Sequence, residues 1–302
     1  MAKKTIPDIE LMNPGHVGCP GCGACHAMRY TLKALGPNTI VSIPACCWAV
    51  MPGPFPLQCL QVPLINTAFE TTGASISGIR AALDAKGIDD ITVVGFAGDG
   101  GTADIGIQAL SGMVERGTDV IYIMYDNEAY MNTGIQRSSS TPVGSWTTTT
   151  PVGKTGDWKK QPKKNMMEIM VAHDIPYAAT VSVGYPEDMI KKLRKAKEIK
   201  GPKFIQAYSP CPTGWKMSPD KTIEICRLAV STAAYPLYEV EDGVYKITRK
   251  PAELKPIMEY LKPQGRFRHL PQEEVDSIQR NVTRAWKRLL KKEEFTQGLA
   301  EL

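Results

Sequence analysis

The chain has 302 residues, of which 43% are hydrophobic and 22% are charged, so it can hold one large α/β domain or a domain with an appendage. This composition excludes wholesale disorder and a coiled coil. The net charge of +5 comes from 36 Lys and Arg against 31 Asp and Glu. Because no nucleic-acid-binding motif accompanies the basic clusters, we expect solvated faces and no nucleic-acid partner.

Targeting signals and cysteines narrow the class further. No apolar run reaches membrane-spanning length and the N-terminus lacks the apolar core of a signal peptide, so we expect a cytoplasmic protein without a membrane partner. Eight cysteines are unusual for such a chain. Without a secretion signal, they favour a metal site or redox centre over a disulfide framework.

The first half of the chain alternates between helical and strand patterns. In chain order we expect a helix over 24–35, a strand over 39–43, a helix over 70–86, a strand over 91–97, a helix over 102–116 and a strand over 119–125. Residues 91–97 and 119–125 are nearly continuous apolar runs, as in parallel strands buried on both faces. With the helix between them they form a βαβ unit.

The second half begins with a long polar stretch over 132–164, which is more often functional or partner-covered than idle. After it we expect a helix over 166–173, a strand over 178–183, a helix over 187–199, a strand over 203–208, a helix over 222–234, a hairpin over 237–240 and 244–248, and a helix over 271–290. The apolar stripe of the last helix fits packing on its own domain and equally an arm that clasps another subunit.

These elements predict an α/β fold with a doubly wound, mostly parallel sheet, helices on both faces and a C-terminal extension. We place the cofactor-binding domain at 1–235. The hairpin and helical arm at 236–302 are expected to contact another subunit.

A glycine-rich segment, Gly98-Asp99-Gly100-Gly101, stands where a buried strand ends and a helix begins. Ligands of open α/β sheets collect at this edge, glycines let the backbone approach a bound group, and the helix N-terminus suits phosphate. Asp99 adds an oxygen ligand for Mg²⁺, which completes its shell with waters and substrate phosphate. A Mg²⁺-bridged diphosphate therefore fits here, although Asp99 as a simple helix cap is the plainer interpretation.

The next strand leads into Asp126-Asn127-Glu128-Ala129-Tyr130, which places Asn127 28 residues beyond Asp99. Adjacent parallel strands would bring both loops to one edge of the sheet, where Asn127 offers an amide oxygen and Ala129 a backbone carbonyl. Together with Asp99 and two phosphate oxygens they supply five of the six ligands of a credible octahedron. The pair of motifs resembles the thiamine diphosphate motif of thiamine-dependent enzymes.

Three loops carry cysteines that can converge: Cys19-Pro20-Gly21-Cys22, Cys46-Cys47, and Cys211 within Ser209-Pro210-Cys211-Pro212. Four thiolates from such loops can hold a [4Fe–4S] cluster or Zn²⁺. A structural zinc site usually draws its ligands in two local pairs, whereas here one pair is local. That spacing favours an iron–sulfur cluster, with a Zn²⁺ site as the remaining alternative.

The combined motifs resemble the thiamine diphosphate-binding β subunit of 2-oxoacid:ferredoxin oxidoreductases, of which pyruvate synthase is a member. The matching stretches are 16–23, Cys46-Cys47, 68–70, 98–101, 126–134 and 209–215, with 263–270 also similar. The segment 46–52 is less typical of the pyruvate enzymes.

The resemblance implies roles for individual residues. It implies Cys19, Cys22, Cys47 and Cys211 as ligands of one [4Fe–4S] cluster. Cys47 is preferred over Cys46 because it lies 25 residues after Cys22 in the sequence, which is the spacing in the family. It further implies Asp99, Asn127 and the Ala129 carbonyl as Mg²⁺ ligands, and Gly98, Gly100, Gly101, Cys22 and Gly23 in contact with the cofactor. Asn132 matches a catalytic asparagine near the reacting carbon. Cys25, Cys59 and Cys226 are expected to be packed thiols.

The activity implied is reversible oxidative decarboxylation of a 2-oxoacid, with pyruvate first, to acyl-CoA and CO₂. Electrons would pass through the cluster to ferredoxin. Other substrates in the family are 2-oxoisovalerate, arylglyoxylate or indolepyruvate, 2-oxoglutarate and oxalate. Two rival hypotheses are a non-oxidative thiamine enzyme with structural zinc and a non-enzymatic electron-transfer subunit.

The chain supplies a diphosphate half only. The resemblance places the pyrimidine half and its glutamate on an α subunit. Further ferredoxin-like clusters belong to γ and δ subunits or their fusion, because no dense C-x2-C-x2-C-x3-C run is present. Coenzyme A, ferredoxin and the 2-oxoacid complete the expected partners, and this chain is predicted to be inactive alone.

Overall fold

The computed structural model describes residues 5–54, 56–154 and 158–300. Residues 1–4 of the expected first domain and 155–157 of the polar stretch lie outside this description. The strands are β1 Thr39–Pro44, β2 Leu64–Thr67, β3 Thr92–Gly98, β4 Val120–Asp126, β5 Tyr177–Ser182, β6 Pro202–Tyr208, β7 Leu237–Glu241 and β8 Val244–Arg249. The α-helices are α1 Gly23–Leu35, α2 Cys47–Val50, α3 Thr72–Ala85, α4 Ile107–Glu115, α5 Met166–Val171, α6 Pro186–Glu198, α7 Pro212–Trp215, α8 Thr222–Ser231, α9 Ile257–Leu261 and α10 Gln272–Ala300. Short turns of other helix types are η1 Gly101–Ile105, η2 Pro219–Lys221 and η3 Gly265–Phe267.

In the described residues these strands form one eight-stranded sheet in the order β2-β1-β3-β4-β6-β5-β7-β8. The strands from β2 to β5 are parallel, and the β7–β8 hairpin adds to β5 in the antiparallel sense. The predicted α/β class with a mostly parallel sheet is confirmed. The hairpin that we assigned to the C-terminal extension continues the central sheet.

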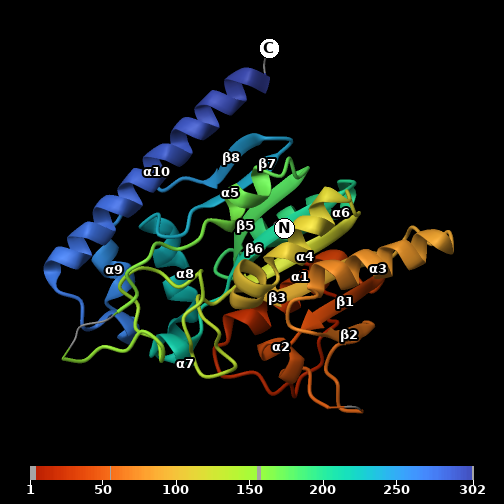
Figure 1. Ribbon diagram of the computed structural model, residues 1–302, viewed down its shortest axis with the longest axis horizontal. Helices are drawn as coiled ribbons and strands as arrows, with labels where there is room; N and C mark the ends of the chain where they lie inside the picture. Colours follow the sequence, from red (N-terminus) through yellow and green to blue (C-terminus); the bar gives the residue numbers. More distant parts are fainter. Residues whose placement is uncertain (1–4, 55, 155–157, 301–302) are drawn as a thin grey trace.

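Helices cover both faces of this sheet, with α1 and α6 packed together and α3 packed on α4 (Figure 1). Strand β4 shows why both faces are apolar. Ile121, Ile123 and Tyr125 belong to the core on one face, and Tyr122 and Met124 to the core on the other. Successive side chains of a strand point to opposite faces, so a strand buried on both sides must be apolar throughout.

Helix α10 extends ten residues beyond the predicted end at 290 and lies along β8 (Figure 1). The extension is held by polar contacts with this edge strand: Tyr245 N donates to Thr296 Oγ1 at 3.0 Å, and Ile247 N donates to Glu293 Oε1 at 2.8 Å. Side chains of α10 thus satisfy N–H groups that an edge strand would otherwise expose. The apolar periodicity could not reveal these polar contacts.

The glycine-rich segment differs from the predicted turn. Gly98 is the last residue of β3, and Asp99 and Gly100 are already helical. Next, η1 forms a π-helical turn in which Gly106 N donates to Gly101 O at 2.8 Å. Single π turns inside helices are frequent at functional sites. The sequence also did not predict β2, which is short and only partly buried.

None of the helices in the described part of the chain is both long and apolar enough to cross a membrane.

Candidate active site

Four neighbouring parallel strands end at the same edge of the sheet. The strand ends are Pro44 of β1, Gly98 of β3, Asp126 of β4 and Tyr208 of β6. The register pairs Gly98 with Tyr125, and Asp126 with Tyr208. The loops that follow therefore bring the Cys46–Cys47 pair, Asp99, Asn127 and Cys211 to one side of the molecule, as the sequence analysis expected for the Asp99 and Asn127 loops.

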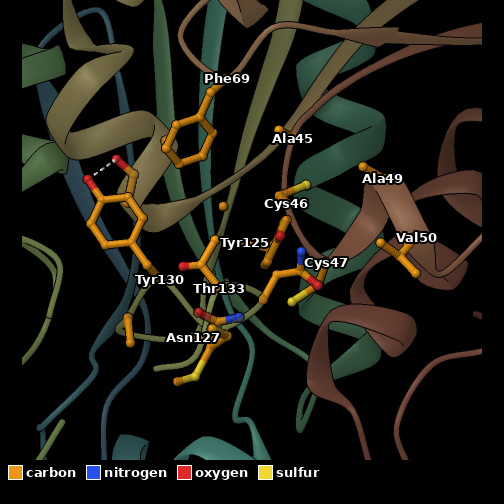
Figure 2. A pocket seen from close by; sticks show the side chains of 16 residues that line it. Ala45, Cys46, Cys47, Ala49, Val50, Phe69, Tyr125, Asn127, Tyr130 and Thr133 are labelled. Carbon is orange, nitrogen blue, oxygen red and sulfur yellow. Dashed lines mark hydrogen bonds between the residues drawn. The ribbon is translucent and has the colours of Figure 1, made fainter. Parts of the chain in front are cut away.

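A cavity of about 280 Å³ opens at this edge. Its lining includes Gly98, Gly100, Gly101, Asn127, Ala129, Asn132, Cys46 and Cys47. Figure 2 shows Asn127 between Tyr130 on one side and the two cysteines on the other. Asn132, the predicted catalytic residue, lines the cavity and is exposed. The cavity thus joins most of the residues that the resemblance assigned to the cofactor.

Three oxygen atoms crowd together beside the cavity. The Asn127 amide oxygen lies 2.8 Å from Asp99 Oδ1 and 3.0 Å from the Ala129 carbonyl oxygen. Neighbouring ligands of an octahedral Mg²⁺, each about 2.05 Å from the ion, lie about 2.9 Å apart. If the Asn127 amide is turned, its NH₂ group donates to both oxygens instead. Without a metal, the Asn127 amide nitrogen is the better neighbour for these two oxygens. Around a bound cation, the amide oxygen can take the same position as a ligand.

Asp99 is fully buried, and Ser138 Oγ donates to its Oδ2 at 2.5 Å. Burial raises the pKa of Asp99 well above its ordinary value, and the nearby carboxylate of Asp126 raises it further. The hydrogen bond from Ser138 acts in the opposite direction. A buried carboxylate of this kind needs a cation beside it to stay ionised.

Aromatic rings pack directly against the glycines of the cradle. A Cβ on Gly100 would lie 2.5 Å from the Tyr130 ring, and one on Gly101 would lie 3.2 Å from the Phe69 ring. The Tyr130 hydroxyl donates to Asp104 Oδ2 at 2.8 Å. A side chain at position 100 would therefore collide with the Tyr130 ring. This packing requirement for glycine was not evident from the sequence.

The cysteine segments meet through close backbone contacts. Gly23 N donates to the Pro210 carbonyl at 3.0 Å, and a Cβ on Gly23 would lie 2.7 Å from Pro210 N. Gly23 follows Cys22, and Pro210 precedes Cys211, so this contact sets the approach of two predicted ligands. On the other side, a Cβ on Gly214 would lie 2.2 Å from Met131 Sδ.

The thiols also influence one another electrostatically. Burial raises the pKa of Cys47, and the neighbouring thiols of Cys46, Cys211, Cys22 and Cys19 raise it further. Burial likewise raises the pKa of Cys211 to about 11, with Cys22 and Cys19 adding to the shift. Thiolates gathered in a buried place repel one another, and bound metal removes that repulsion.

The two adjacent cysteines differ in what they face. Burial raises the pKa of Cys46, while hydrogen bonds from the Tyr125 hydroxyl and the Gly98 backbone lower it. Both thiols line the cavity, but of the two only Cys47 has its pKa raised by Cys211, Cys22 and Cys19. This difference favours Cys47 as the proposed ligand.

Cys25, Cys59 and Cys226 are buried, as expected of packed thiols. Within the described ranges, no three His, Cys, Asp or Glu side chains converge closely enough to hold a single metal ion. A [4Fe–4S] cluster does not require that convergence, because each thiolate binds a different iron.

Outside the cavity lining lies a set of charged residues, buried except for the partly exposed Lys163, that the sequence analysis missed. Lys163 Nζ lies 2.7 Å from Asp126 Oδ2 and 2.8 Å from Glu128 Oε1, and Arg266 Nη2 lies 2.5 Å from Glu128 Oε2. Burial raises the pKa of Glu128, but Lys163 and Arg266 lower it by more, so it remains ionised. The signals in the sequence were two stretches of the family resemblance, 126–134, which includes Glu128, and 263–270, which includes Arg266.

One further lysine anchors the long polar stretch. Lys159 is fully buried, and its Nζ donates to the carbonyls of Thr141 at 2.9 Å and Gln161 at 2.7 Å. Burial lowers the pKa of Lys159 to about 8. Residues of this stretch reach the site itself, since Ser138 binds Asp99.

Comparisons with known proteins agree with this geometry. The family described as "Thiamine pyrophosphate enzyme, C-terminal TPP binding domain" matches residues 54–207. Ketoisovalerate oxidoreductase subunit VorB of Pyrococcus furiosus is 58% identical over 294 residues, which cover 95% of this chain and 94% of that protein. Pyruvate synthase subunit PorB of Methanothermobacter thermautotrophicus is 54% identical over 277 residues, which cover 92% of this chain and 96% of that protein.

The solved structure of 2-oxoglutarate:ferredoxin oxidoreductase from Magnetococcus marinus has a TM-score of 0.58 at 19% identity, covering 90% of this chain and 98% of that chain. At that identity the likeness concerns the fold. Fold and family match define a chain of the thiamine diphosphate-binding class. Its relatives are more specific, and the chain belongs to the 2-oxoacid:ferredoxin oxidoreductase family, as the thiamine diphosphate-binding β subunit.

Enlarging Gly23 should separate the cysteine segments. We expect Gly23→Ala to destabilise the fold by roughly 1–3 kcal/mol, because the added methyl meets the Pro210 backbone rather than a flexible side chain. Bound iron should fall. Iron and sulfide analysis of the anaerobically purified complex tests this, with Gly78→Ala on the exposed side of α3, whose added Cβ meets nothing within 4 Å, as the control. Full iron content in Gly23→Ala would contradict the prediction.

Lys159 should make stability depend on pH. The pKa of the Lys159 side chain is about 8 in the folded chain and has its ordinary value of 10.5 in the unfolded chain. Raising the pH from 8 to 10.5 therefore stabilises the folded state. Relative to Lys159→Met, the wild type should gain up to about 1.4 kcal/mol per pH unit between pH 8 and 10. Melting temperatures measure this, with the exposed Lys160→Met as control. Identical pH slopes for wild type and Lys159→Met would contradict it.

Proposed function

We propose that this chain seats the Mg²⁺–diphosphate half of thiamine diphosphate and one [4Fe–4S] cluster in a CoA-dependent 2-oxoacid:ferredoxin oxidoreductase. The single observation that carries the proposal is the convergence of the Asp99 carboxylate, the Asn127 side-chain amide and the Ala129 carbonyl, with the amide 2.8 and 3.0 Å from the other two groups. Their number, type and spacing fit a hard divalent cation that also binds phosphate. The 48–58% identity to 2-oxoacid oxidoreductase subunits supports the activity.

The residues of this chain have separate tasks at the cofactor corner. Asp99, Asn127 and the Ala129 carbonyl would hold Mg²⁺, while the backbone of Gly98, Gly100 and Gly101 would border the diphosphate. When bound, thiamine diphosphate supplies carbanion chemistry at the 2-oxo carbon. Asn132, exposed in the cavity lining, would orient the substrate by hydrogen bonding, which makes it the proposed catalytic residue of this chain.

Cys19, Cys22, Cys47 and Cys211 would hold the cluster that accepts electrons from the oxidised substrate. Cys22 and Gly23 would lie at its boundary with the cofactor. In addition to burial, the thiols of Cys211, Cys22 and Cys19 raise the pKa of Cys47, and those of Cys22 and Cys19 raise the pKa of Cys211, which supports their grouping. Because Cys47 also lines the cavity, the cluster would stand next to the cofactor, a short route for electrons. Ferredoxin would receive the electrons through ferredoxin-like clusters of γ and δ subunits.

An α subunit would cover the open side of the cavity. Activation of thiamine diphosphate needs a carboxylate at its aminopyrimidine ring, and none of the described cavity-lining residues is Asp or Glu. Exposed apolar side chains lie at this side: Val50 is 55% exposed, and Val17 is 61% exposed. They are neighbours, because Val17 N donates to the Met51 carbonyl. Such surfaces are typical of subunit contacts.

We propose an aliphatic 2-oxoacid as substrate, with pyruvate first and 2-oxoisovalerate as the second candidate. Ala45, Ala49, Val50, Phe69 and Met131 give the cavity an apolar side that suits such a substrate. The relatives include both a pyruvate synthase subunit and a ketoisovalerate oxidoreductase subunit. The acyl group would pass to coenzyme A. The free cysteines suit the reducing cytoplasm, where we place the enzyme.

Separate substitutions should remove separate cofactors. In the native complex purified without oxygen, we expect Asp99→Ala to abolish Mg²⁺-dependent thiamine diphosphate binding and leave the iron–sulfur absorption near roughly 400 nm intact. Cys211→Ala should do the converse. Both variants should lose 2-oxoacid-dependent viologen reduction, measured with pyruvate and with 2-oxoisovalerate. If the wild-type complex holds zinc and no sulfide, or if each substitution removes both cofactors, the proposed division of the site is wrong.

A further inference from the structure

The residue between the two predicted metal ligands has an unusual backbone. Glu128 has a φ of +66°, in the left-handed region that non-glycine residues rarely adopt. This conformation turns the chain between Asn127 and Ala129, so that the side chain of one and the carbonyl of the other reach the same point beside Asp99. A residue in this region persists only where its surroundings hold it there.

Glu128 is held at both ends. Its side chain is 5% exposed and contacts Lys163 through Oε1 and Arg266 through Oε2, at 2.8 and 2.5 Å. Its backbone carbonyl accepts a hydrogen bond from Thr141 Oγ1 at 2.7 Å. Lys163 also contacts Asp126, one residue before the metal ligand Asn127.

Arg266 is itself fixed from several sides. It is fully buried, its guanidinium lies 3.8 Å from the centre of the Trp215 ring, and it donates to Gln264 Oε1 at 3.0 and 2.8 Å. Trp215 Nε1 donates to the backbone carbonyl of Asn127 at 2.8 Å. Arg266 therefore braces both sides of the turn, directly through Glu128 and indirectly through Trp215.

Resting on the proposed function, we propose that Glu128 and Arg266 are positioning residues that set the affinity of the Mg²⁺–diphosphate corner by holding residues 127–129 in their ligating conformation. Neither side chain is among the residues that line the cavity. They act through Asn127 and Ala129, as outer partners of metal ligands do elsewhere.

The charges in this cluster balance, with Asp126 and Glu128 opposite Lys163 and Arg266. Removing one partner leaves a buried charge uncompensated, which destabilises the fold whatever its role, whereas removing both restores the balance. The double variant Glu128→Gln with Arg266→Met therefore separates a structural role from a positioning role.

The test uses the whole complex, purified anaerobically from wild type, Glu128→Gln, Arg266→Met and the double variant. Mn²⁺ serves as the probe in place of Mg²⁺, and its binding is followed by electron paramagnetic resonance with thiamine diphosphate present. Melting temperature and iron content are measured on the same samples. Lys192→Met is the matched control, because Lys192 is 1% exposed, lies 2.8 Å from the partly exposed Asp188, and belongs to α6, outside the site.

We expect both single variants to bind Mn²⁺ roughly 10- to 100-fold more weakly. The double variant should regain melting temperature without regaining Mn²⁺ affinity, and Lys192→Met should lose melting temperature while keeping the affinity. The inference is overturned if the double variant recovers both properties, or if Glu128→Gln binds Mn²⁺ as the wild type does. If the wild type itself does not bind Mn²⁺, the proposed function falls, and this inference with it.

Discussion

The common edge at which β1, β3, β4 and β6 end is the constraint on which the rest of the site depends. Parallel strands in register place their carboxyl ends side by side, so segments as far apart as Cys47 and Cys211 become neighbours. Each strand is followed at once by a functional segment. Backbone hydrogen bonding, rather than any contact among the functional side chains, thus determines which loops can share a ligand.

The environment at this edge favours bound positive charge. Burial raises the pKa values of Asp99, Cys47 and Cys211, so each group resists ionisation without a cationic partner. Just behind them, Glu128 stays ionised because Lys163 and Arg266 compensate for its burial. The charge of Glu128 is thus compensated within the chain. The Asp99 carboxylate and the thiols are the groups whose ionisation a bound ligand would compensate.

Distant parts of the sequence complete this arrangement. Lys163 comes from the polar stretch that the sequence indicated as functional, and Arg266 comes from the region after the β7–β8 hairpin. Trp215, in the helix that begins after Cys211, donates to Asn127 and lies against Arg266. The contacts of Trp215 thus join the proposed metal corner to the proposed cluster segment.

Local sequence patterns determined the elements and the chemistry. Apolar runs and helical periodicity predicted most elements near their observed bounds, and residue types at the strand ends identified Asp99, Asn127 and the cysteines as candidates. These properties depend on each segment's own composition. The direct passage from β3 into helix, the last ten residues of α10 and the Glu128–Lys163–Arg266 cluster could not be predicted in this way. They rest on contacts between residues far apart in the chain, whose energies appear only when the sheet brings the segments together.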